Sequence, residues 1–266
     1  MQDGLMLDHI SKVYQDDNSE VLAIKEFSYA FSKGDFISIV GPSGCGKSTL
    51  LSIISGLEKP TSGKVFLDGE DITGKVSNIG YMLQKDYLLS WRTVYRNVLL
   101  GLEIKNMLNE ETKEYAMNLL KTYGLGDFIN KYPSQLSGGM KQRVALIRTL
   151  ATNPSYLLLD EAFSALDYQT RLDVTNDVYN IIKKEHKTAI MVTHDIPESI
   201  SMSDKIIVLS NRPSIIKNVH GITFNIPNRT PLNCRECPEF SKYFDSIWKE
   251  LNTDERSNFG GQERVS

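Results

Sequence analysis

The stretch GPSGCGKST, residues 41–49, combines a flexible backbone with side chains that bind phosphate. Gly41, Gly46, Lys47 and Ser48 match the pattern G-x-x-x-x-G-K-[ST]. Glycines let successive backbone N–H groups curve around an anion, and a helix that follows adds the partial positive charge of its N-terminus. In this pattern the lysine reaches the β- and γ-phosphates of a nucleotide, and the hydroxyl beside it binds Mg2+. The residues of this predicted nucleotide-binding loop are Gly41, Pro42, Ser43, Gly44, Cys45, Gly46, Lys47, Ser48 and Thr49.

The segments on both sides of the loop fit that chemistry. FISIV (36–40) is a short apolar run that predicts a buried strand, and STLLSIIS (48–55) predicts a helix that begins at the loop. The four matching residues alone also describe a structural glycine turn without a ligand. The order strand, loop, helix is the context that the phosphate-binding motif requires, so it favours nucleotide binding.

A second apolar run ends in two carboxylates that complement the loop. In YLLLDE (156–161), Asp160 is the last residue of a predicted buried strand and Glu161 follows it. Asp160 can bind Mg2+ directly or through water, and Glu161 can polarise an attacking water. An acidic strand end that merely faces solvent is the alternative, and the phosphate-binding loop upstream favours the functional interpretation.

The elements that must position these residues predict an α/β fold. Short, nearly continuous apolar runs are typical of strands buried on both faces of a parallel sheet. SGKVFLDGEDI (62–72) and alternating stretches before residue 36 predict an antiparallel sheet at its flank. Between about residues 85 and 152 the strand pattern disappears, and TKEYAMNLLKTYG, which ends on Gly124, predicts part of a helical insertion. The predicted core strands are FISIV (36–40), YLLLD (156–160), TAIMVT (188–193) and KIIVL (205–209).

Composition argues against several classes of protein. The chain has 266 residues, 41% of them hydrophobic, and no apolar run approaches the roughly 18 residues of a membrane span. The start, MQDGLMLDHI, contains two acids and lacks the basic-then-apolar order of a targeting segment. A formal net charge of -3 without a basic stripe disfavours nucleic-acid binding, and three cysteines are too few for a disulfide framework. We therefore expect a cytosolic protein that reaches a membrane only through a partner.

Three further motifs make the assignment specific. LSGGMKQR (136–143), SALD (164–167) and VTHD (192–195) stand in the order found in the ATP-binding cassette family, and the first resembles the family's signature motif almost letter for letter. The resemblance implies a P-loop NTPase fold with a mixed core sheet, a flanking antiparallel β subdomain and a helical signature subdomain. It implies an ATPase domain over residues 1–220. Residues 221–266 are then a C-terminal extension, and its last dozen residues are expected to be disordered.

The resemblance also implies a dimer. SGGM leads into a helix predicted from about residue 140, and such a glycine-rich helix N-terminus is suited to an anion. In the family this motif faces the P-loop of a second subunit, so two copies arranged head to tail are expected to enclose two ATP molecules. A structural glycine cap is the alternative. The residues expected to act across this interface are Ser137, Gly138, Gly139 and Asp167.

The same resemblance assigns roles to single residues. Glu161 is expected to be the general base, and His194 the switch residue that contacts the γ-phosphate and helps to position the water. Gln84 resembles the glutamine that senses Mg2+, and Tyr14 resembles the aromatic residue that stacks on adenine. A structural histidine, a surface glutamine and a packing tyrosine are the respective alternatives. The implied cofactors are ATP and Mg2+; the expected catalytic group is Lys47, Gln84, Glu161 and His194, and the expected metal group is Ser48, Gln84 and Asp160.

One stretch points to a subfamily. GYMLQKDYLLSWRTVYRNVLLGLEI (80–104) resembles the nitrate, sulfonate and taurine import ATPases, a subfamily that includes ATPases for pyrimidine precursors, and LSNRPSII (209–216) agrees with its LSxRPxxI pattern. In the family this region accepts a coupling helix of the permease. Tyr87 and Trp91 are candidate anchors there, and packing of both rings within the helical lobe is the alternative. Ser90 stands where the subfamily usually has proline, so we expect a less rigid turn.

The expected function is that of an importer's energy-coupling ATPase at the cytoplasmic face of the membrane. Its implied partners are transmembrane permease subunits and, indirectly, an extracytoplasmic solute-binding protein. The alternatives are an exporter ATPase, a soluble ATP-gated clamp on ribosomes or DNA, and a paralogue that binds ATP without turning it over. Clamps usually carry two cassettes or a coiled-coil insertion, and neither is visible in the sequence. The presence of Lys47, Asp160, Glu161 and His194 weighs against the last alternative.

The cysteines leave two questions open. Cys45 precedes a predicted helix, whose N-terminus lowers a thiol pKa and favours reactivity, but a small filler residue is the preferred interpretation. Cys234 and Cys237 form a C-x-x-C pair without the second pair or nearby histidine that structural zinc needs. For that pair, a loop coincidence is preferred over a metal or redox role.

Overall fold

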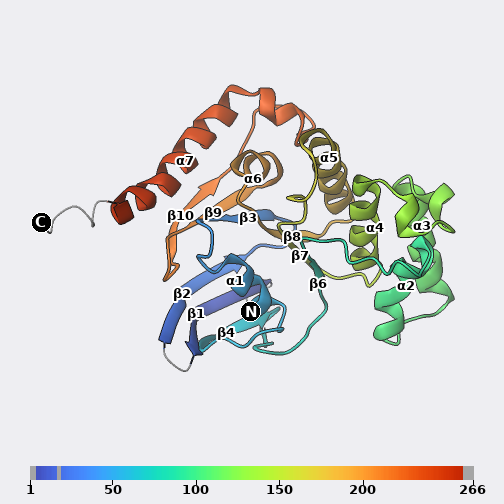
Figure 1. Ribbon diagram of the computed structural model, residues 1–266, viewed down its shortest axis with the longest axis horizontal. Helices are drawn as coiled ribbons and strands as arrows, with labels where there is room; N and C mark the ends of the chain where they lie inside the picture. Colours follow the sequence, from blue (N-terminus) through green and yellow to red (C-terminus); the bar gives the residue numbers. More distant parts are fainter. Residues whose placement is uncertain (1–3, 17–18, 260–266) are drawn as a thin grey trace, which may run out of the picture. The chain divides into compact units, whose positions relative to one another are not determined.

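The computed structural model describes residues 4–16 and 19–259 (Figure 1). Its chain divides into two compact units. The first unit comprises Met1–Ser77 and Ile190–Ser266, and the second comprises Asn78–Ala189. Because the chain leaves the first unit and later returns to it, the second unit is an insertion in sequence.

An antiparallel sheet forms the N-terminal part of the first unit. Its strands follow the order β2-β1-β4-β5, and all neighbouring pairs are antiparallel. The last part of β2 alternates: Phe27 and Phe31 are buried and Tyr29 is half-buried, whereas Ser28 and Ala30 are exposed. The predicted flanking sheet and its hairpin at residues 62–72 are confirmed. The strands are β1 (Leu5–Asp16), β2 (Ser19–Phe31), β4 (Ser62–Leu67) and β5 (Glu70–Asp71).

A second sheet has six strands in the order β10-β9-β3-β8-β7-β6. β3 pairs with β9 and β6 with β7 in parallel, whereas β10 joins β9 antiparallel, so the predicted mixed core sheet is confirmed. Every residue of β3 and β8 is buried, which is why these segments are apolar without alternation. The strands are β3 (Phe36–Val40), β6 (Ile79–Met82), β7 (Tyr156–Asp160), β8 (Thr188–Val192), β9 (Lys205–Leu209) and β10 (Ile216–Gly221).

The α-helices described in the first unit are α1 (Lys47–Ile54), α6 (Ile196–Met202) and α7 (Pro238–Phe259). α7 closes an apolar core in which Ile247 packs with Ile196 and Ile200 of α6. The segment after β10 therefore shares the core of this unit. The boundary proposed at residue 220 and the disorder of the last dozen residues stay predictions, and residues 260–266 lie outside the described residues.

The second unit carries the predicted helical region. Its helices are α2 (Val94–Ile104), α3 (Glu110–Thr122), α4 (Gly138–Leu150) and α5 (Tyr168–Lys184). Leu119 and Leu120 of α3 are buried, and Gly124 takes the left-handed φ of +73° just after that helix, as its predicted C-terminal cap requires. α4 begins at Gly138, two residues before the predicted start, because Ser137 supplies an N-cap.

Candidate active site

The predicted nucleotide-binding loop lies between the end of β3 and the start of α1 in the first unit. Gly44 and Gly46 have φ of +73° and +113°, conformations that glycine adopts readily and other residues do not. A side chain at Gly46 would also lie 3.2 Å from Ile24 Cγ1. Lys47 is only 6% exposed, and its ammonium group donates to the carbonyl oxygens of Gly41 at 2.8 Å and Pro42 at 2.9 Å. The lysine is thus curled back into the loop that it was predicted to serve.

Tyr14 of β1 lies beside this loop. Its hydroxyl donates to Glu58 Oε2 at 2.9 Å and lies 3.2 Å from Thr49 Oγ1, and the side chain is 40% exposed. The ammonium of Lys12 lies 5.0 Å from the centre of the Tyr14 ring. Partial burial of the hydroxyl raises the pKa of Tyr14. The structure therefore brings an exposed aromatic ring next to the last residue of the predicted loop.

Arg212 is a contact of this loop that the sequence interpretation missed. Its Nε donates to the carbonyl oxygen of Gly44 at 3.1 Å, and its Nη2 donates to the same oxygen. Two residues later, Ser214 N donates to Ala23 O at 3.0 Å, which ties this turn to β2. The segment LSNRPSII contains this arginine, but the sequence analysis interpreted the segment only as a pattern typical of the subfamily. The arginine of that pattern supports the phosphate-binding loop.

We expect Arg212→Ala to weaken nucleotide binding. Because the variant lacks the charged donor to Gly44 O, the loop is held less firmly. We expect the affinity for the nucleotide to fall about three- to tenfold. Titration with a fluorescent ATP analogue measures it, with Arg212→Lys as a variant that keeps the charge without the two-pronged contact. An unchanged dissociation constant in Arg212→Ala would contradict a supporting role.

His194 follows β8 in the first unit and is exposed. Thr193 N donates to Ile39 O of β3 at 3.4 Å, which fixes the residue before it. Asp195 begins α6 as its N-cap and accepts from Glu198 N at 2.8 Å. The histidine is therefore held between a buried strand and a capped helix, while its side chain reaches the surface.

Asp160 is the last residue of β7 in the second unit, and Glu161 follows it. Tyr81 of β6 donates its hydroxyl proton to Asp160 Oδ2 at 3.0 Å. Glu161 has φ of +46°, an unusual conformation for a residue with a side chain, and its carbonyl oxygen accepts from Ser164 N at 3.1 Å and Ser164 Oγ at 3.0 Å. Strained backbone of this kind persists where the surrounding structure enforces it and is frequent at functional sites.

Gln84 lies in the same unit, two residues after β6. Its Nε2 donates to Ser164 Oγ at 3.0 Å, so the predicted metal-sensing glutamine is linked to the turn that follows Glu161. A hollow of about 390 Å³ is lined here by Gln84, Tyr87, Gly138 and Leu166, among others. Three sequence motifs of the second unit, around residues 84, 138 and 166, therefore meet at one place.

The signature residues cap α4. Ser137 Oγ accepts from Met140 N at 3.3 Å, and both Ser137 and Gly138 are exposed. Gly139 is buried instead, and a Cβ there would lie 2.8 Å from Val174 Cγ2 of α5. This glycine thus permits close packing of two helices in addition to its predicted ligand role.

Asp167 caps α5 in the same way. Its Oδ1 accepts from Thr170 N at 3.0 Å, and this backbone hydrogen bond lowers the pKa of the Asp167 carboxyl group. The carboxylate is exposed and charged at neutral pH. It is available to a partner while it stabilises the helix N-terminus.

The loop after Gln84 is held by a half-buried polar side chain of α4. Arg148 of α4 donates to Tyr87 O at 2.9 Å and Asp86 O at 2.7 Å. Tyr87 and Trp91 are 60% and 74% exposed, so the alternative that both rings pack within the helical lobe is wrong.

Asn97, which is fully buried, holds the turn around Ser90. Its Nδ2 donates to the carbonyl oxygens of Leu89, Arg92 and Thr93 at 3.0–3.1 Å, and its Oδ1 accepts from Leu89 N at 2.7 Å. These four hydrogen bonds join the turn to α2, and the lower rigidity expected from Ser90 stays a prediction.

The cysteine side chains are buried. Cys45 is 2% exposed, and burial raises the pKa of its thiol, so the lowered pKa considered for it is wrong and the filler interpretation holds. Cys234 Sγ contacts the carbonyl oxygens of Ser201 and Pro231 at 3.6 Å, and Cys237 Sγ contacts Asn233 O at 3.6 Å. Among the side chains that the structure describes, no group of three or more His, Cys, Asp or Glu is placed to hold a metal ion.

No helix in the described part of the chain has the length and apolar character needed to cross a membrane. A family model described as ABC transporter matches residues 24–164. The chain is 50% identical over 252 residues to YtlC of Bacillus subtilis, an uncharacterized ABC transporter ATP-binding protein, covering 95% of this chain and 97% of that one. It is 39% identical over 250 residues to the nitrate import ATP-binding protein NrtD of Synechocystis sp., covering 91% and 93%.

A solved structure gives the same assignment. The ATP-binding cassette MJ0796, in a dimeric post-hydrolysis state bound to ADP and Pi, superposes with a TM-score of 0.68 at 32% identity, covering 83% of this chain and 99% of that one. Family model, relatives and fold agree with the motifs on which the sequence interpretation rested. The chain belongs to the ABC transporter family and is one of its ATP-binding subunits, an enzyme that hydrolyses ATP to drive transport.

Proposed function

We propose that this subunit energises import of a small anion such as nitrate, a sulfonate or taurine, or of a pyrimidine-type precursor. The observation that carries the proposal is similarity to a nitrate import ATP-binding protein over 91% of this chain. The subfamily stretch at residues 80–104 supports it independently of the ATP-binding motifs. The transported molecule itself is selected by other subunits.

ATP binds, in this proposal, through the loop of residues 41–49, with the Tyr14 ring stacked on adenine. Lys47 exchanges its contacts with Gly41 O and Pro42 O for the β- and γ-phosphates. A charged donor already satisfied within the loop makes this exchange without leaving a buried ammonium unpaired.

Mg2+ would be held by Ser48, Gln84 and Asp160. All three offer oxygen atoms, the ligands that Mg2+ prefers, and the amide nitrogen of Gln84 is the atom that donates to Ser164, which leaves its oxygen for the metal. The bound ion neutralises charge on the β- and γ-phosphates.

Glu161 acts as general base and takes a proton from the attacking water. His194 contacts the γ-phosphate and helps to position that water. Catalysis then consists mainly of positioning and charge neutralisation, without a covalent intermediate. The enforced backbone at Glu161 and the fixed neighbours of His194 support these roles.

A second copy of the chain completes each site in a head-to-tail dimer. Ser137, Gly138 and Gly139 approach the γ-phosphate from across the interface, and Asp167 links the two sites. The exposed N-terminus of the 13-residue helix α4 supports this arrangement, since a helix N-terminus attracts anions. An isolated monomer should hydrolyse ATP slowly.

The membrane partner is a permease that docks on the loop carrying Tyr87 and Trp91. Both rings are exposed on a backbone held by Arg148 and Asn97, and large aromatic side chains on a fixed backbone are frequent anchors of interfaces. The chain then lies at the cytoplasmic face of the membrane, and a solute-binding protein delivers the substrate on the opposite side.

Affinity purification from solubilised membranes of the native host tests this function. The bait is tagged Glu161→Gln, which traps the ATP-bound state, and Glu161→Gln combined with Trp91→Ala is the matched control. We expect mass spectrometry to identify a polytopic permease with the first bait and much less of it with the second. A co-purifying solute-binding protein would narrow the class of substrate.

Two outcomes contradict the importer assignment. Ribosomal proteins or DNA-binding factors without any membrane protein would support an ATP-gated clamp. A permease of an export system would leave the ATPase assignment standing and overturn the direction of transport.

A further inference from the structure

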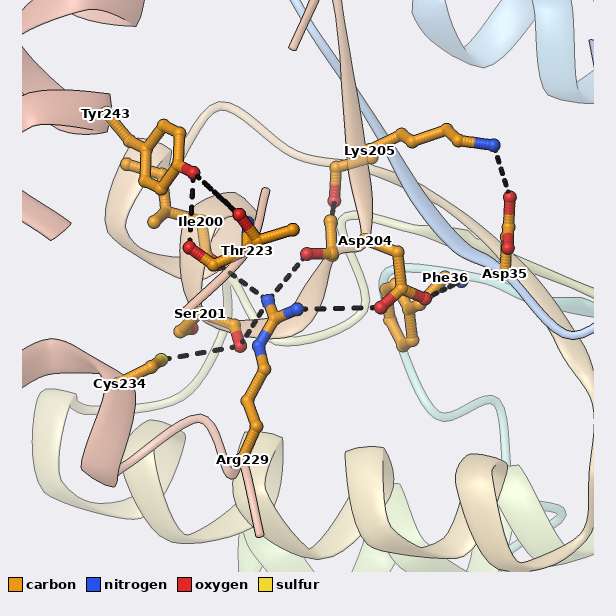
Figure 2. A network of polar contacts seen from close by, with 12 residues as sticks. Asp35, Phe36, Ile200, Ser201, Asp204, Lys205, Thr223, Arg229, Cys234 and Tyr243 are labelled. Carbon is orange, nitrogen blue, oxygen red and sulfur yellow. Dashed lines mark hydrogen bonds and ion pairs between the residues drawn. The ribbon is translucent and has the colours of Figure 1, made fainter. Parts of the chain in front are cut away.

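Arg229, in the segment after β10, contacts the carboxyl end of α6 (Figure 2). Its Nη2 donates to the carbonyl oxygens of Ile200 at 3.1 Å, Ser201 at 3.3 Å and Ser203. Its Nη1 lies 3.5 Å from Asp204 Oδ1, and the side chain is only 15% exposed. One half-buried guanidinium therefore contacts three backbone carbonyl oxygens and a carboxylate.

α6 needs a partner at this end. It has seven residues, too few for a helix that is stable alone, and the last carbonyls of any helix have no donor within it. Its C-cap, Ser203, is extended rather than the left-handed glycine that ends many helices. A positive charge at the carboxyl end also interacts favourably with the helix dipole. Arg229 thus replaces the missing cap.

At the other end of α6, its N-cap Asp195 directly follows His194. Asp195 caps this end through Glu198 N at 2.8 Å, and Asp195 N donates to Thr193 Oγ1 at 3.0 Å. At about 1.5 Å per residue the helix is only about 10 Å long. A short helix fixed at both ends moves as one body, so its carboxyl end determines where its amino end lies.

Asp204 extends the network to the strand that carries the phosphate-binding loop. Its Oδ2 accepts from Phe36 N at 2.8 Å, and its own N–H donates to Phe36 O at 2.7 Å. Phe36 begins β3, and the loop follows the end of that strand. Arg229 therefore joins α6 and β3 at a single point.

The C-terminal segment holds Arg229 in place. The guanidinium lies 5.0 Å from the ring centre of Phe224, and that ring packs against the core formed by Ile200, Ile222 and Ile247. The C-terminal segment thus anchors the arginine, and the guanidinium N–H groups donate to the carboxyl end of α6.

We propose that Arg229 is a positioning residue for ATP hydrolysis: by capping α6 and joining it to β3, it fixes the location of His194 relative to the phosphate-binding loop. This inference rests on the role proposed for His194. It gives the C-terminal segment a part in the reaction, although that segment lies outside every sequence motif of the site.

The test compares Arg229→Gln and Arg229→Lys with wild type, using full-length chain without an affinity tag. Arg235→Gln is the matched control, because Arg235 belongs to the same segment but lies over the Phe240 ring, 6.0 Å from its centre. ATP turnover is measured at a temperature well below the midpoint of thermal unfolding. The rate is divided by the number of nucleotide-binding sites found by titration. We expect kcat per site to fall about tenfold in Arg229→Gln and less in Arg229→Lys, with KM for ATP changed less than twofold.

A second readout needs no turnover. The chain has four histidines, so a nucleotide-free sample with isotope-labelled imidazoles gives few NMR signals, and the His194→Ala variant identifies the one from His194. We expect this signal to shift or broaden in Arg229→Gln while the His9 and His186 signals stay in place. Arg235→Gln should reproduce the wild-type spectrum.

The outcomes separate the two proposals. A lower unfolding midpoint with an unchanged His194 signal and unchanged kcat per site would mean that Arg229 only stabilises the fold, and the inference would be wrong. Wild-type kcat per site in His194→Ala would overturn the role proposed for His194, and the NMR signal would still report whether Arg229 fixes α6.

Discussion

Glu161→Gln is expected to abolish steady ATP turnover while ATP binding persists. The change keeps the size of the side chain and the left-handed backbone of this position, but an amide cannot accept a proton from the attacking water. General base catalysis contributes roughly 10²- to 10⁴-fold to a rate, so kcat should fall by that factor. Because the loop of residues 41–49 is untouched, nucleotide affinity should stay within about twofold.

Phosphate release under saturating ATP measures this effect, and nucleotide titration measures binding on the same samples. Glu114→Gln is the matched control, because Glu114 is an exposed glutamate of α3 in the same unit. It should turn over ATP at the wild-type rate. Residual activity above a tenth of wild type in Glu161→Gln would show that another group takes the proton. Absence of turnover in wild type would favour the alternative of a paralogue that binds ATP without hydrolysing it.

The core of the fold was predictable because burial on both faces leaves a simple mark in a sequence. β3 and β7 were predicted with their observed bounds, and β8 with one residue too many, because each is a continuous apolar run. The phosphate-binding loop could equally be predicted, because its glycines and lysine are close neighbours in the chain. Local patterns of this kind need no knowledge of tertiary contacts.

What the sequence did not predict depends on contacts between distant residues. Arg212 meets Gly44 across 168 positions, and Arg229 meets Ser201 across 28. A lone arginine carries no local signal of the carbonyl that it will contact. The pKa of Cys45 was likewise undetermined, because the helix N-terminus lowers it, burial raises it, and only the folded structure shows that burial dominates. Polar contacts between distant segments therefore had to come from the structure.

Asn97→Ala is expected to produce the largest loss of stability. Four hydrogen bonds at 2.7–3.1 Å join the Asn97 amide to the turn at residues 89–93, and the side chain is fully buried. Truncation leaves Leu89 N and several carbonyl groups without this partner, and buried polar groups left unpaired cost about 1–3 kcal/mol each before relaxation. We expect the free energy of unfolding of the second unit to fall by about 2–4 kcal/mol.

Urea unfolding followed by Trp91 fluorescence measures this loss, because Trp91 lies within the turn that Asn97 holds. The chain has two tryptophans, so both samples carry Trp248→Phe to leave Trp91 as the sole reporter. Asn118→Ala is the matched control: Asn118 is an exposed residue of α3, and alanine there should leave stability unchanged or raise it slightly. A loss below about 0.5 kcal/mol in Asn97→Ala would mean that water or a rearranged backbone replaces the hydrogen bonds of Asn97 in the turn. If the loss is as large as expected, the same variant should also recover less permease, since the ring of Trp91 would no longer be presented on a fixed backbone.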